Sequence, residues 1–159
     1  MTEKMSRWGI GPWLIVITAS FAAVVFVIDR ALSPMFKIRG VPDLAIWTVS
    51  GVLIAAGIVM LALSGRDLNR AYEGDTLCTT GTFAVCRNPI YSAWILFLLP
   101  GMALLFGSWL MLTVPAVLYI AFRVLIRKEE VHLEQTFGEA YLDYKRRVYA
   151  IFPTLFKKS

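Results

Sequence analysis

Long apolar runs alternate with short polar segments along the whole chain. Residues 9–28 and 44–63 are almost uninterrupted apolar stretches of about twenty residues, the length that a helix needs to cross roughly 30 Å of hydrocarbon. Two more apolar runs follow at 90–106 and 109–126, separated by a Gly-Ser break. The pattern predicts an all-α integral membrane bundle of about four transmembrane helices, 9–28, 44–63, 90–106 and 109–126, with the last two paired as a helical hairpin.

The composition agrees with a membrane protein. Hydrophobic residues make up 58% of the 159 residues and charged residues 17%, and the mean hydropathy is +0.66. Soluble domains average about 45–50% apolar and about 25% charged residues. A chain of this length is expected to form one domain, so residues 1–159 are predicted to be a single membrane domain.

Small residues and a proline within the predicted spans indicate how the helices pack. Gly51, Ala55, Ala56 and Gly57 give the second span a face suited to close helix contact. Pro100 removes a backbone donor from the third span, so this helix is expected to bend or open locally.

Two polar segments, 64–89 and 127–159, flank the predicted spans. In the second segment, apolar residues recur at spacings of four, four, three and four, which places them on one stripe of an amphipathic helix. We expect this helix to lie at the cytosolic membrane surface, and segment 64–89 to be cytosolic as well. The residues of the stripe are Leu133, Phe137, Tyr141, Tyr144 and Val148.

The distribution of basic residues predicts the orientation in the membrane. Four spans place both termini on one side, and that side carries most of the Lys and Arg residues, whereas the other carries Arg30, Lys37 and Arg39. Both termini should therefore be cytosolic. This asymmetry explains the net charge of +5 without a nucleic-acid partner. Membrane lipids are the expected partners, because anionic headgroups attract the basic residues of the C-terminal segment, which are Lys145, Arg146, Arg147, Lys157 and Lys158.

The run Arg87-Asn88-Pro89 directly precedes the third apolar run. Asn is a favoured helix N-cap and Pro is favoured at the first helical position, so a helix is expected to begin here. A guanidinium beside the free N–H groups of a helix start favours an anion. The alternative is that these residues only cap the helix and set the topology.

Charged residues cluster where the fourth apolar run ends. Arg123 lies one turn inside the predicted span, where a charged side chain suggests a function. The alternative is that its long side chain snorkels to the membrane surface. Glu130, on the same helical face, is a candidate ion partner for Arg123. No metal site is predicted, because the two cysteines form no CxxC motif and His132 has no second ligand nearby.

Two blocks of this sequence resemble the isoprenylcysteine carboxyl methyltransferase family, and the related phospholipid N-methyltransferases share the general pattern. The resemblance covers about residues 77–156. It implies an integral membrane enzyme that uses S-adenosylmethionine and releases S-adenosylhomocysteine. The cofactor would be enclosed by the cytosolic segments 64–89 and 127–159, without a Rossmann fold. The residues that carry the resemblance are Gly81, Phe83, Arg87, Asn88, Pro89, Tyr91, Glu129, Glu130, Leu133, Phe137, Gly138, Tyr141, Tyr144, Val148 and Pro153.

The resemblance also suggests roles for individual residues. Arg87 and Asn88, with Pro89, would bind the amino-acid end of the cofactor, although many family members have histidine at the position of Asn88. Glu129 or Glu130 would bind its ammonium group or ribose hydroxyls. The purine and ribose would lie against Tyr91, Tyr141 and Tyr144. The candidate catalytic residues are Arg123, for an anionic substrate or for orienting the glutamates, and Glu130, as a base if the acceptor is an amine.

The expected reaction is methyl transfer to a hydrophobic, lipid-like acceptor at the membrane interface. O-methylation of a carboxylate, as in an isoprenylcysteine-type substrate, needs no enzymic base and depends on in-line positioning in a site shielded from water. The alternatives are a phospholipid or other small-molecule N- or S-methyltransferase, an NADPH-dependent membrane reductase, and a membrane scaffold without enzymatic activity. The segment Gly9-Ile10-Gly11-Pro12 is not a nucleotide-binding motif, since an apolar span follows it.

Overall fold

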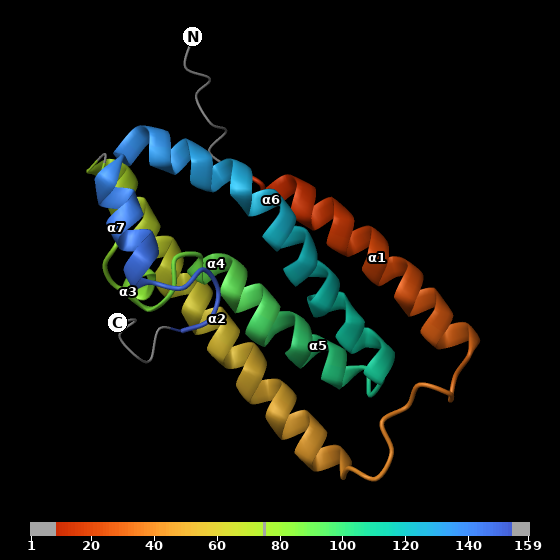
Figure 1. The fold of residues 1–159 in the computed structure, drawn as a ribbon. Helices are drawn as coiled ribbons and strands as arrows, with labels where there is room; N and C mark the ends of the chain where they lie inside the picture. Colours follow the sequence, from red (N-terminus) through yellow and green to blue (C-terminus); the bar gives the residue numbers. More distant parts are fainter. Residues whose placement is uncertain (1–8, 75, 154–159) are drawn as a thin grey trace.

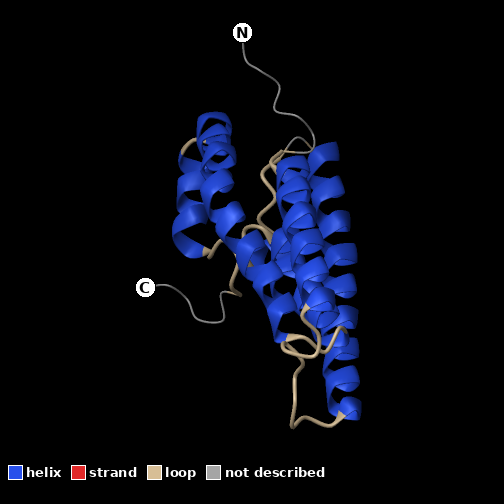
Figure 2. Ribbon diagram, turned by 90° about the vertical axis from the view of Figure 1, so that its right-hand side faces the viewer, coloured by secondary structure: helices blue, strands red, loops and turns tan. Residues whose placement is uncertain are grey.

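The computed structural model describes residues 9–74 and 76–153, which form helices joined by loops without a β-strand (Figures 1 and 2). The all-α prediction is confirmed. The expected headgroup contacts of Lys157 and Lys158 lie outside the described residues. The elements in chain order are α1 (Gly11–Ala31), α2 (Asp43–Glu73), α3 (Thr82–Val85), α4 (Pro89–Ser92), the π-helix η1 (Ala93–Leu98), α5 (Leu99–Leu105), the 3-10 helix η2 (Trp109–Leu112), α6 (Thr113–Phe137) and α7 (Glu139–Arg147).

Three of the helices are long and apolar enough to cross a membrane, namely Gly11–Ala31, Asp43–Ala71 and Trp109–Phe137. The remaining predicted span corresponds to the shorter apolar segment Pro89–Leu105, which joins α4, η1 and α5. Most apolar side chains of the three long helices are exposed on the isolated chain. Continuous apolar surface of this extent is typical of helices that face lipid, so the described residues form a multi-pass membrane protein.

The long helices lie in one row. The helix α1 packs against α6, α6 contacts η1 and α5, and these in turn pack against α2. The helices α1 and α2 therefore stand at opposite edges, and the connector between them passes around the end of the α5–α6 hairpin (Figure 1). Backbone hydrogen bonds hold this connector to the hairpin turn, from Ile38 N–H to the Gly107 carbonyl and from Trp109 N–H to the Phe36 carbonyl.

The close contact of α2 with η1 and α5 depends on glycine. A Cβ atom at Gly57 would lie 2.6 Å from Cγ of Leu98, and one at Gly101 would lie 2.8 Å from Cγ1 of Ile54. Gly57 therefore serves the packing that the small-residue face predicts, whereas Gly51 on the same helix has no neighbour within 4 Å. Only the part of the predicted face around Gly57 is used in helix contact.

Pro100 opens the third apolar run locally, as the sequence predicts. The turn before it is π-helical, and the Leu99 N–H bonds to the Trp94 carbonyl, five residues earlier. The physical reason is that proline lacks an N–H and its ring crowds the preceding carbonyls. A π-helical turn accommodates this without breaking the helix.

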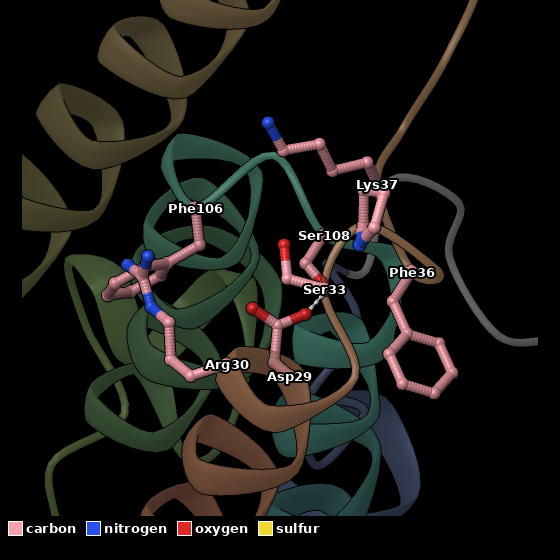
Figure 3. A pocket seen from close by; sticks show the side chains of 8 residues that line it. Asp29, Arg30, Ser33, Phe36, Lys37, Phe106 and Ser108 are labelled. Carbon is pink, nitrogen blue, oxygen red and sulfur yellow. Dashed lines mark hydrogen bonds between the residues drawn. The ribbon is translucent and has the colours of Figure 1, made fainter.

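A small polar pocket lies at the end of the row where the connector meets the hairpin turn (Figure 3). There Ser108 donates a hydrogen bond to Asp29 at the end of α1. The Arg30 guanidinium stands 5.1 Å from the centre of the Phe26 ring. The Ser108–Asp29 hydrogen bond fastens α1 to the hairpin turn at the end opposite α7.

The predicted C-terminal amphipathic helix corresponds to α7, but the single stripe expected from Leu133 to Val148 is wrong. Gly138 has a φ of +53° and separates α6 from α7. Leu133 belongs to α6, and Val148 is extended backbone beyond α7. The positive φ at Gly138 turns the chain so that α7 folds back against α6.

Candidate functional site

The residues singled out by the sequence gather at the end of the row that carries α7. Four segments meet there: the loop before α4, the last turns of α6, the helix α7, and residues 148–151 that follow it (Figure 1). These segments are far apart in the sequence, and specific polar contacts join them.

Arg87 links three of these segments. Its Nη1 donates to Oε1 of Glu130 at 2.8 Å and to the hydroxyl of Tyr141 at 3.1 Å, and its Nε donates to the Val148 carbonyl at 3.0 Å. The side chains of Arg87 and Glu130 are only 10% and 15% exposed. A buried ion pair with additional hydrogen bonds offsets the cost of removing two charges from water, so the contacts of Arg87 account for its burial.

Lys145 completes the ion-pair network from the other side of Glu130. Its Nζ lies 2.9 Å from Oε2 of Glu130 and 2.6 Å from Oε1 of Glu134. Hydrogen bonds to Glu134 and Glu130 raise the pKa of the Lys145 amine. The expected lipid-headgroup role of Lys145 is therefore wrong, because its ammonium group pairs with α6. The spacing of four residues from Tyr141 could have placed Lys145 on the inward face of α7.

Asn88 and Ser92 bind the backbone of residues 150 and 151, beyond the end of α7. The N–H and the Nδ2 of Asn88 both donate to the Ala150 carbonyl, at 3.0 and 3.2 Å, and the Ser92 hydroxyl donates to the Ile151 carbonyl at 2.7 Å. Asn88 occupies the N-cap position before Pro89, as predicted, but its side chain makes no capping bond. That side chain is used to hold residues 148–151 instead, which the sequence did not reveal.

Two buried tyrosines of α7 face this network. The Tyr144 hydroxyl donates to the Phe83 carbonyl at 2.6 Å, and the Tyr141 hydroxyl accepts from Arg87. Burial raises the pKa of both phenols. Both therefore stay protonated at neutral pH, so Tyr141 retains a proton to donate, whereas Tyr144 uses its proton to hold α7 to α3.

The two adjacent glutamates point into different surroundings. Glu130 joins Arg87 and Lys145, whereas the Glu129 carboxylate lies against Gly9 at the start of α1. Successive helical residues are about 100° apart around the axis, which explains the divergence. Tyr91 stands near the start of α1 and packs on Phe122, with ring centres 5.2 Å apart.

Arg123 lies outside the network. Its side chain is exposed on α6, and Glu130 follows seven positions later, a rise of about 10 Å. Among the described residues, Glu130 pairs with Arg87 and Lys145 and not with Arg123. The expected Arg123–Glu130 pair is therefore wrong. The reason is tertiary: α7 and the loop before α4 supply the cations that Glu130 binds.

Within the described part of the chain, no three His, Cys, Asp or Glu side chains cluster closely enough to hold a metal ion. The two cysteines, Cys78 and Cys86, are free thiols.

The row of long apolar helices defines a multi-pass membrane protein, and comparison with known families identifies the group to which it belongs. Residues 44–140 match the phospholipid methyltransferase family. That match covers more than half of the chain, and the chain belongs to this family. The predicted membership of a membrane methyltransferase family is confirmed.

The relatives include a metal-resistance protein and isoprenylcysteine O-methyltransferases. The chain is 33% identical over 159 residues to the cobalt-zinc-cadmium resistance protein CzcN of Cupriavidus metallidurans. This alignment covers 95% of this chain and 66% of CzcN. It is 30% identical over 112 residues to the protein-S-isoprenylcysteine O-methyltransferase of Rattus norvegicus, covering 60% of this chain and 39% of that enzyme. The protein-S-isoprenylcysteine O-methyltransferase of Mus musculus is 36% identical over 90 residues, covering 54% of this chain and 32% of that enzyme. The chain thus spans about two thirds of the first relative and less than half of the other two.

Proposed function

We propose that this chain transfers a methyl group from S-adenosylmethionine to a hydrophobic, lipid-like acceptor at the membrane surface. The observation that carries the proposal is the buried Arg87–Glu130–Tyr141 cluster at one end of a row of apolar helices. Membership of the phospholipid methyltransferase family supports the reaction class. An apolar acceptor could reach such a site directly from the bilayer.

The polar groups of the cluster fit the charged end of the cofactor. A guanidinium has five N–H donors, and the hydrogen bonds of Arg87 use Nε and Nη1. Its Nη2 group takes part in none of these bonds and is suited to a carboxylate. Tyr141 adds a hydroxyl donor, and Glu130 supplies a carboxylate for the ammonium group or the ribose hydroxyls. We therefore place the amino-acid end of the cofactor beside these three residues.

The other predicted cofactor residues would frame this site. Asn88 and Tyr144 use their side-chain donors on backbone carbonyls, so their contribution is to fix the walls. Pro89 is buried directly beside Asn88 at the start of α4. Tyr91 offers an aromatic ring next to Phe122 for a contact with the purine or ribose. Glu129 faces α1, and its geometry supports a different role, which is argued below.

The chemistry favours an acceptor that needs no base. S-adenosylmethionine, when bound, supplies a methyl group on a sulfonium with a neutral leaving group. An amine acceptor would have to lose a proton, but both oxygens of Glu130 already accept from cations, Oε1 from Arg87 and Oε2 from Lys145. A carboxylate acceptor is already deprotonated, so the protein needs only to orient it and exclude water. We therefore favour O-methylation, as in an isoprenylcysteine-type substrate.

Arg123 is our candidate for binding the acceptor. Its guanidinium is exposed on an apolar helix, where an unpaired charge is costly. A carboxylate of an amphipathic acceptor would pair with it while the apolar part stays in the bilayer. Nearby on the same helix, Tyr119 contacts Phe152, with ring centres 6.2 Å apart.

The decisive experiment is thermal unfolding of the detergent-purified protein with S-adenosylmethionine, S-adenosylhomocysteine or NADPH. A ligand at a hundredfold excess over its dissociation constant should stabilise the folded protein by about 2.7 kcal/mol. We expect stabilisation by both adenosyl compounds and none by NADPH. Stabilisation by NADPH alone would favour a membrane reductase, and no effect of any ligand would favour a scaffold.

A second experiment separates the possible acceptors. The protein is incubated with S-adenosylmethionine carrying a labelled methyl group and either a prenylated cysteine carboxylate or an ethanolamine phospholipid. We expect label in the carboxylate ester. Label in the phospholipid amine would instead support N-methylation of a phospholipid, which also fits the name of the matched phospholipid methyltransferase family.

A further inference from the structure

The helix α1 begins without a capping group of its own. Ile10 at the N-cap position makes no side-chain capping bond, and the first turn contains no acidic residue. The first N–H groups of a helix have no partner within the helix and carry a partial positive charge. Pro12 lacks an N–H, but those of Ile10 and Gly11 remain, so the first turn needs a partner from another part of the protein.

Glu129 on α6 is placed to be this partner. The Ile10 N–H lies close to the Glu129 carboxylate and interacts with it electrostatically. A Cβ atom at Gly9 would lie 3.0 Å from Oε1 of Glu129, so glycine at this position lets the carboxylate approach the backbone. The Oε2 atom is buried and has no hydrogen-bond partner in the described structure. The positive end of the α1 dipole compensates part of this cost.

The first turn of α1 also packs against residues of the candidate site. The Ile10 side chain is 8% exposed and belongs to the core cluster that includes Phe122 and Ile126 of α6. A Cβ atom at Gly11 would lie 4.0 Å from the hydroxyl of Tyr91, so the backbone of α1 runs beside this tyrosine. The start of α1 thus closes one wall of the region that contains Tyr91.

We propose that Glu129 is a positioning residue whose carboxylate clamps the first turn of α1 to the end of α6 and thereby holds the wall beside Tyr91. The two adjacent glutamates then have separate tasks, since Glu130 organises the Arg87 network and Glu129 organises α1. The effect on methyl transfer rests on the proposed function, whereas the clamp itself does not.

The test compares Glu129→Ala with Glu129→Gln by hydrogen–deuterium exchange of the full-length protein, read in peptides that cover residues 9–14. Glutamine keeps a carbonyl oxygen that can accept from the Ile10 N–H but carries no charge. We expect Glu129→Ala to speed exchange there by roughly fivefold or more, the size expected for loss of a helix cap. Glu129→Gln should restore most of the protection, and exchange in peptides covering residues 148–151 should not change in either variant.

A glycine pair provides a second test that leaves Glu129 in place. Gly9→Ala would push against the carboxylate, whereas Gly107→Ala is a matched control, because Gly107 has a similarly positive φ of +62° but no neighbour within 4 Å. Exchange is read in peptides around each substituted glycine, and we expect a clearly larger increase around Gly9 than around Gly107. Increases of equal size would indicate backbone strain alone and contradict the clamp.

Cofactor affinity distinguishes the clamp from direct binding. If Glu129 contacts the cofactor through its charge, Glu129→Gln should lose S-adenosylmethionine binding as fully as Glu129→Ala, with exchange at the start of α1 unchanged. That result would overturn the clamp. Failure of the proposed methyl transfer would leave the exchange experiment interpretable, because protection at residues 9–14 is measured without any ligand.

Discussion

Arg87 contacts three segments of the chain, so its substitution tests the site most directly. Arg87→Ala should abolish S-adenosylmethionine binding and lower the free energy of unfolding by about 3 kcal/mol, because it leaves a buried carboxylate without one of its cations. Calorimetric titration and thermal unfolding measure the two effects. Arg127→Ala is the control, since Arg127 is exposed on α6.

Arg87→Lys is a second variant that separates loss of cofactor binding from misfolding of the protein. Lysine keeps the charge but cannot make the forked contacts to Glu130, Tyr141 and Val148 together. We expect this variant to remain folded and to bind the cofactor at least tenfold more weakly, a loss of about 1.4 kcal/mol. A folded Arg87→Lys protein with wild-type affinity would remove Arg87 from the cofactor site.

The two tyrosines of α7 should respond differently to loss of their hydroxyls. Tyr144→Phe leaves the buried Phe83 carbonyl without its donor and should cost about 1–3 kcal/mol of stability, with little change in cofactor affinity. Tyr141→Phe removes a donor that faces the proposed cofactor and should weaken binding instead. Thermal unfolding and titration of both variants decide this, and the reverse pattern would exchange the two roles.

At the scale of the elements, the contact between α2 and α5 should be sensitive to a single methyl group. Gly101→Ala places a Cβ 2.8 Å from Ile54, so we expect a loss of about 1–3 kcal/mol from overpacking. Gly51→Ala is the matched control on an open part of α2 and should be neutral or stabilising by up to about 1 kcal/mol. Thermal unfolding of both variants in the same detergent measures the difference. Equal stability of the two would show that α2 and α5 separate easily.

At the scale of the whole molecule, the orientation in the membrane can be read from chemical accessibility. We predict that the end carrying α7 is cytosolic, since most basic residues lie there, whereas Lys37 lies in the connector at the other end. The test starts from a variant in which Cys78 and Cys86 are replaced. With the further substitution Lys37→Cys, this variant should react with a membrane-impermeant maleimide added to intact cells. A cysteine at Arg127→Cys should react only after the membrane is opened. The opposite pattern would invert the topology.

The sequence by itself determined the class of the fold and the ingredients of the site. Apolar runs of about twenty residues can satisfy their backbone in a bilayer only as helices, so the all-α membrane architecture followed directly. Arg87, Glu130 and Tyr141 could be selected as candidates because they belong to the two sequence blocks that resemble the methyltransferase family. The break at Gly138 carried a local signal as well, since glycine is the usual residue at a helix end.

Only the tertiary structure decided which of these residues meet. Lys145, rather than Arg123, pairs with Glu130 because α7 folds back on α6, and Asn88 binds Ala150 because residues 148–151 return to the start of α4. The opposite directions of Glu129 and Glu130 depend on where α1 and α7 stand around α6. Such contacts join positions as much as 120 residues apart, and helical periodicity describes only neighbours within a few turns. The sequence therefore shows which charged residues are present, whereas the packing of the helices determines which of them form pairs.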